Sequence, residues 1–116
     1  MPSVFSNYMK KLLFVCSQNK WRSLTAEKIF ENHEDYSVKS AGTENGARVK
    51  ITAGLIGWAD IVFVMEKKHR SRIQDKFGDS LNDKPLYVLN IPDEYQFMDE
   101  ELIEILENRV GGIIEI

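Results

Sequence analysis

Short, almost wholly apolar runs separated by polar stretches are the feature that most constrains the fold of this chain. The clearest run covers residues 61–65, with the sequence IVFVM, and another covers residues 11–15. Runs of this length without alternation are typical of strands buried on both faces, as in parallel sheets covered by helices. Residues 36–41 and 85–89 are two further strand candidates.

Helix candidates alternate with these strands. We expect helices over residues 24–32, 51–58 and 66–77, the last stopped by Gly78, and a final helix capped by Asp99 and ended by Gly111 and Gly112. This alternation predicts a doubly wound α/β fold, a four-stranded parallel sheet with helices on both faces. We expect residues 1–8 to be a flexible leader and residues 9–116 to form a single domain. Ligands of such sheets bind beyond the carboxyl ends of the strands.

Composition excludes several function classes. The chain has 116 residues, a net charge of −3, one cysteine and two histidines. One cysteine rules out an intramolecular disulfide and a zinc site built on several thiolates, and two distant histidines argue against a His-rich metal site. The acidic balance argues against a dedicated nucleic-acid binder, and the apolar runs are too short to span a membrane. We therefore expect a cytoplasmic protein with no metal, cofactor, nucleic-acid or membrane partner.

The cysteine stands at the carboxyl end of the first predicted strand, directly before a polar loop and a predicted helix. The loop is Cys16, Ser17, Gln18, Asn19, Lys20, Trp21, Arg22 and Ser23. A loop of this length closing onto a helix start can aim several backbone N–H groups at one anion, and the positive end of the helix favours both that anion and a thiolate.

The side chains of the loop suit an oxyanion site with a nucleophile. Cys16 can attack, Arg22 can grip two oxygens as a bidentate fork, and Ser23 can donate a hydrogen bond to the sulfur. Asn19 can hold the shape of the loop through bonds to the backbone. The alternative interpretation is a buried structural cysteine, a common role for a free thiol.

The loop resembles the signature of the low-molecular-weight protein tyrosine phosphatases, which reads Cys, any, Gly, Asn, any, any, Arg, Ser. Thr25-Ala26-Glu27, Ser40-Ala41-Gly42-Thr43 and the stretch from Ala59 to Met65 resemble further segments of that family. The similarity runs from about Met9 to Tyr95. It implies the family fold and a cofactor-free phosphatase that forms a phosphocysteine intermediate on a phosphorylated protein or a small aryl phosphate.

The resemblance also implies a general acid. The family carries an Asp-Pro-Tyr turn after the fourth strand, and here Pro92-Asp93-Glu94-Tyr95 lies in that place. Asp93 then protonates the leaving oxygen and afterwards activates water, while Tyr95 and Trp21 form walls for the substrate. The alternatives are an ordinary turn at Asp93, a Tyr95 ring packed on the sheet edge and a Trp21 ring packed beneath the loop.

Three departures from the family pattern leave a second function open. Gln18 replaces a glycine, Trp21 stands where many members have a second cysteine, and residues 44–58 are shorter than the family's substrate-contacting segment. The alternative function is therefore a phosphate- or phosphoprotein-binding module with little or no turnover. The basic stretch of residues 67–72 is expected to be a solvated helix face.

Overall fold

The computed structural model describes residues 9–115; the predicted leader lies outside them. The elements follow one another as β1 (Lys10–Cys16), α1 (Arg22–Phe30), β2 (Tyr36–Gly42), α2 (Ala53–Trp58), β3 (Ile61–Val64), α3 (Lys67–Leu81), β4 (Leu86–Val88) and α4 (Glu100–Gly111). No helix within residues 9–115 is long and apolar enough to cross a membrane.

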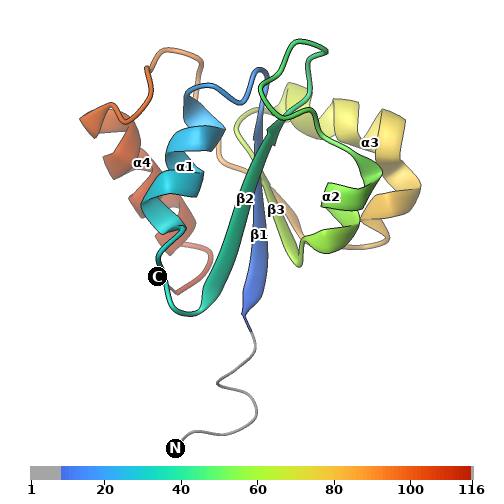
Figure 1. The fold of residues 1–116 in the computed structure, drawn as a ribbon, viewed down its shortest axis with the longest axis horizontal. Helices are drawn as coiled ribbons and strands as arrows, with labels where there is room; N and C mark the ends of the chain where they lie inside the picture. The colour runs from blue at the N-terminus through green and yellow to red at the C-terminus, as the bar shows by residue number, and fades with distance from the viewer. Residues whose placement is uncertain (1–8, 116) are drawn as a thin grey trace, which may run out of the picture.

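The strands form one parallel sheet in the order β2-β1-β3-β4, so the apolar runs β1 and β3 lie side by side at its centre. Their register places Phe14 opposite Phe63. Helices α1 and α4 cover one face of the sheet, and α2 and α3 cover the other (Figure 1). The predicted doubly wound, four-stranded parallel sheet with helices on both faces is confirmed.

Each face of the sheet has its own apolar core because successive side chains of a strand point to opposite faces. Phe14 belongs to the core beneath α1 and α4, where its ring lies 5.7 Å from that of Phe30 and 5.0 Å from that of Phe63. Leu13 and Val15 belong to the other core, with Ile56 of α2 and Ile73 of α3. Both faces of β1 are thus buried, which explains its unbroken apolar run.

Helix α3 does not end at Gly78 as predicted. The backbone departs from helical angles at Phe77 (φ −131°, ψ 25°), and the helix then resumes through Gly78 to Leu81. Glycine weakens a helix without forbidding it, and the actual stop is Asn82, which takes the left-handed conformation (φ 40°) typical of a helix end. The predicted cap of α4 is confirmed, since the Asp99 side chain accepts from the backbone N–H groups of Glu101 and Leu102.

Candidate functional site

The candidate site lies where β1 and β3 send the chain to opposite faces of the sheet. The chain leaves β1 toward α1 and leaves β3 toward α3, so a crevice opens at the carboxyl ends of these neighbouring strands (Figure 1). A cavity of about 160 Å³ occupies this position. It is lined by Cys16, Ser17, Gln18, Lys20, Trp21, Arg22 and Asp93.

The sulfur of Cys16 faces two hydrogen-bond donors. The Ser23 hydroxyl oxygen lies 3.0 Å from Sγ, and the backbone N–H of Asn19 donates to Sγ over 3.3 Å. Ser23 Oγ also accepts from the Asn19 side-chain amide over 2.7 Å, and its own hydrogen has two acceptors within reach, the sulfur at 3.0 Å and the Ala41 carbonyl at 3.4 Å. Donors of this kind stabilise a thiolate, the nucleophilic form of cysteine.

Asn19 gives the loop its shape. It is buried and adopts the left-handed backbone conformation (φ 56°), which asparagine tolerates better than most residues. Besides bonding Ser23, its amide donates to Ser40 Oγ over 2.8 Å, and Ser40 donates to Glu27 over 2.5 Å. The predicted shaping role of Asn19 is therefore carried by side-chain hydroxyls rather than by backbone groups.

The backbone amides of the loop remain available to an anion. Within the described part of the chain, the N–H groups of Gln18, Lys20 and Trp21 donate to no other protein atom. Trp21 is also the N-cap of α1, and its side chain forms no capping bond. The first turn of α1 therefore adds further free N–H groups and the positive end of the helix dipole, as an oxyanion site requires.

Arg22 is held in place from the far side of the crevice. Its side chain is only 2% exposed, and Nη1 donates to Glu66 Oε2 over 2.5 Å and to the Ile91 carbonyl over 2.8 Å. Burial alone would raise the pKa of Glu66, but the hydrogen bond and charge of Arg22 outweigh it and hold that pKa below its usual value. Both holding bonds use Nη1. The other edge, formed by Nε and Nη2, carries neither of them, has Asp93 Oδ1 3.8 Å from Nε, and suits an oxyanion.

Ser17 is tied to the first turn of α3 by a buried histidine. His69 is fully buried, and its Nδ1 accepts from the Glu66 backbone N–H over 3.0 Å as part of a capping box. The ring proton therefore resides on Nε2, which lies 2.9 Å from Ser17 Oγ and donates to it. Burial, followed by the positive charge of Arg22, lowers the pKa of His69 to about 4, so the ring is neutral near pH 7.

The short segment after β2 packs directly on the loop. The backbone N–H groups of Thr43, Glu44 and Arg48 donate to the carbonyls of Cys16, Ser17 and Gln18 over 3.0, 3.0 and 2.9 Å. A Cβ on Gly42 would lie 2.5 Å from the Ser17 carbonyl oxygen, so this approach requires glycine. The left-handed turn falls on Asn19 and not on Gln18, which explains how the loop accommodates Gln18 in place of a glycine.

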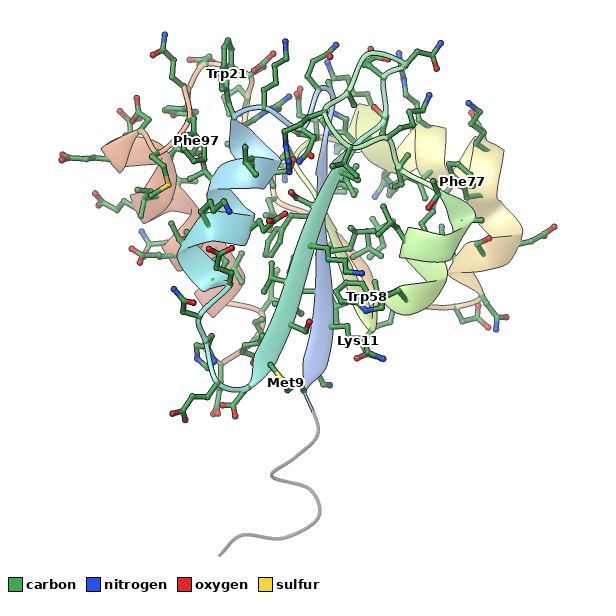
Figure 2. The ribbon with its side chains drawn as sticks, in the orientation of Figure 1. Met9, Lys11, Trp21, Trp58, Phe77 and Phe97 are labelled. Atoms are coloured by element: carbon green, nitrogen blue, oxygen red, sulfur yellow. The ribbon has the colours of Figure 1, made fainter. Side chains whose placement is uncertain are left out.

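The structure brings most of the predicted site residues together. Asn19 and Ser23 are buried behind the loop and support it, while the other residues of the loop line the cavity. Trp21 is 44% exposed at the carboxyl end of the sheet, opposite the end where Met9 lies (Figure 2). Tyr95 is not among the lining residues; its ring packs against the core, and its hydroxyl donates to Glu101 over 3.0 Å.

Sequence reasoning missed the residues that hold the loop from a distance. The basic stretch of residues 67–72 was expected to be solvated, which is wrong for His69 because that ring points inward to Ser17. The signal was available: Glu66 follows the buried run of β3, and His69 stands three residues later, at the spacing of a capping box. Among residues 9–115, no group of three or more His, Cys, Asp or Glu side chains is arranged to hold a metal ion.

Comparison with known proteins gives matches of structure only. No protein-family model and no curated sequence matches the chain. The tyrosine phosphatase Wzb from Escherichia coli K30, solved in complex with phosphate, is similar with a TM-score of 0.71 and 22% identity, over 87% of this chain and 93% of that one. The low-molecular-weight protein tyrosine phosphatase SP-PTP from Streptococcus pyogenes gives 0.74 and 16%, over 92% and 95%.

A phosphatase named for a different substrate shares the same architecture. The YwlE arginine phosphatase from Geobacillus stearothermophilus is similar with a TM-score of 0.67 and 21% identity, over 89% of this chain and 91% of that one. The chain therefore has the fold of the low-molecular-weight protein tyrosine phosphatases over nearly its whole length.

Proposed function

We propose that this protein is a cysteine-dependent phosphomonoesterase, similar to the low-molecular-weight protein tyrosine phosphatases, that acts through a phosphocysteine intermediate. The observation that carries the proposal is the convergence of a nucleophile, an oxyanion cradle and a carboxyl group on one cavity, as Cys16, the loop with Arg22, and Asp93. The fold shared with tyrosine and arginine phosphatases supports it. The substrate is a phosphorylated protein or a small aryl phosphate.

In the first step the Cys16 thiolate attacks phosphorus on the side opposite the ester oxygen. The bond between phosphorus and that oxygen breaks, and Asp93 in its acid form gives the oxygen its proton. The loop amides and the edge of Arg22 formed by Nε and Nη2 hold the equatorial oxygens, whose negative charge is stabilised most in the transition state. Asp93 suits this role because its carboxylate lines the cavity, 3.8 Å from Arg22 Nε.

In the second step Asp93, now a carboxylate, takes a proton from water, and the water oxygen attacks phosphorus. The bond between phosphorus and sulfur breaks, the sulfur keeps the electron pair, and inorganic phosphate leaves. The Ser23 hydroxyl, 3.0 Å from Sγ, stabilises the sulfur as it regains its negative charge.

The decisive experiment is hydrolysis of para-nitrophenyl phosphate with a chelator present. We expect turnover by the wild type, its abolition in Cys16→Ser, and a loss of about 10²-fold or more in Asp93→Asn for an alkyl phosphate, whose leaving oxygen needs protonation most. Asp99→Asn is the matched control, because asparagine also caps a helix and this carboxylate serves α4. Undiminished turnover in Cys16→Ser would refute the mechanism.

One observation favours the alternative of a phosphate-binding module with little turnover. The Asp93 side chain is 56% exposed and its carboxylate is oriented toward Arg22, whereas an acid catalyst must reach the oxygen opposite Cys16. Binding of inorganic phosphate by the wild type, together with no hydrolysis of aryl or alkyl phosphates, would support this alternative.

A further inference from the structure

The first turn of α3 contacts the anion-binding loop at both ends. Glu66, the N-cap of α3, bonds Arg22 at the carboxyl end of the loop, and His69 bonds Ser17 at the other end. The same two α3 residues are bonded to each other, because the Glu66 backbone N–H donates to His69 Nδ1. The distance between the two ends of the loop is thus set by one rigid helical turn.

We propose that His69 is a positioning residue that fixes the anion-binding loop through the bond from Nε2–H to Ser17 Oγ. The inference rests on the anion-binding part of the proposed function and adds a residue to it. His69 is not among the residues that line the cavity, and its bond to Ser17 links it to one that is. Its effect is therefore on the geometry of the loop amides and, through them, on the affinity for an oxyanion.

Burial makes this contact more than a helix cap. A capping role is complete once Nδ1 accepts from Glu66, and it leaves Nε2 without a function. A fully buried ring N–H without a partner would be costly, and Ser17 supplies that partner. Because Oγ accepts from His69, the hydroxyl hydrogen of Ser17 must turn to another acceptor, and Ser17 lines the cavity where an anion would lie.

The two functions of His69 can be separated by two substitutions. In His69→Asn the side-chain oxygen can replace Nδ1 and keep the bond from Glu66, but the shorter side chain cannot reach Ser17. In His69→Gln the amide nitrogen can replace Nε2 and keep the bond to Ser17, but the acceptor for Glu66 is lost. A positioning role therefore predicts that His69→Gln binds phosphate more tightly than His69→Asn. A purely structural role predicts the opposite order, with the more stable variant binding more tightly.

The experiment measures the affinity for inorganic phosphate and for orthovanadate by calorimetry, and stability by urea unfolding, in the same samples. We expect His69→Asn to be the more stable variant and His69→Gln the better binder. The phosphate Kd should rise about 3- to 10-fold in His69→Asn, the equivalent of one hydrogen bond, and stay within about 2-fold in His69→Gln. Ser17→Ala should match His69→Asn, and combining them should add nothing.

An exposed serine on the same helix, Ser71, provides the matched control, and Ser71→Ala should leave the phosphate Kd unchanged. Affinities that follow stability, or additive losses in the double variant, would overturn the positioning role. A wild type that binds phosphate but hydrolyses no ester would overturn the proposed hydrolase while the ranking still decides the role of His69. A wild type that does not bind phosphate would overturn both.

Discussion

Acidification should destabilise the fold chiefly through His69. Burial first, and then the charge of Arg22, lower the pKa of this ring to about 4 in the folded chain from the ordinary value of 6.5, against the opposing effect of Glu66. Between these two values the unfolded chain binds more protons than the folded chain, so the free energy of unfolding falls as the pH falls. The loss begins near pH 6.5 and levels off below about pH 4.

The magnitude follows from the width of that window. Each unit of pKa difference corresponds to about 1.4 kcal/mol. Acidification from about pH 7 to about pH 4.5 therefore lowers the free energy of unfolding by on the order of 2–3 kcal/mol. Glu66 contributes little to this decrease in stability, because its pKa is lowered from 4.5 and its carboxylate is protonated only at lower pH. A domain of this size has only about 5–15 kcal/mol of stability, so Tm should fall by roughly 10 °C.

The assay is urea unfolding followed by tryptophan fluorescence at about pH 7 and about pH 4.5, for the wild type and His69→Gln. The variant has no titrating ring at this position, so it should lose about 2–3 kcal/mol less than the wild type over the same interval. The other ionisable groups are common to both chains. Glu66, whose pKa His69 also lowers, titrates mainly below this interval. Equal losses in the two proteins would refute the argument.

Four further substitutions test the loop and its surroundings. Gly42→Ala should lower the free energy of unfolding by about 1–3 kcal/mol and weaken phosphate binding, because the new Cβ would meet the Ser17 carbonyl oxygen at 2.5 Å. The control is Gly57→Ala in α2, where a Cβ would meet no atom within 4 Å outside its own helix and neighbours. In the same urea titration it should raise the free energy of unfolding by about 0.5–1 kcal/mol. Asn19→Ala should lower the free energy of unfolding by about 2–4 kcal/mol, since it removes two buried hydrogen bonds and places alanine at φ 56°. A decrease of less than about 1 kcal/mol would contradict the shaping role of Asn19. Trp21→Ala should raise KM several-fold for an aryl phosphate and leave KM for an alkyl phosphate unchanged, since only a ring can stack on the exposed indole; equal changes for both substrates would show that Trp21 is no substrate wall.

The parts of the molecule that sequence reasoning predicted are those set by neighbouring residues. The buried strand β3 follows from its unbroken apolar run, and the start of α4 follows from Asp99 one residue before the helix. The loop from Cys16 to Ser23 is likewise one continuous segment whose residue types already indicate an oxyanion site.

The parts that were missed depend on contacts between distant segments. Glu66 is 44 residues from Arg22 in the sequence, and His69 is 52 residues from Ser17. A charged residue on a helix is normally solvated, so only the strand order, which puts β3 beside β1, shows that this turn of α3 faces the loop. The end of α3 was misplaced because its kink at Phe77 and its left-handed stop at Asn82 have stronger effects than the glycine between them.

The pairing of β3 with β1 has a consequence for how the protein is made. During synthesis, the loop with Cys16 emerges well before Glu66, His69 and Asp93, yet its arginine and its first hydroxyl are held by the later segment. A nascent chain or proteolytic fragment that ends before residue 66 therefore carries Cys16, the proposed nucleophile, without the residues that hold the loop around it. Under the proposed function, we therefore expect anion binding only from chains in which both halves of the sheet have assembled.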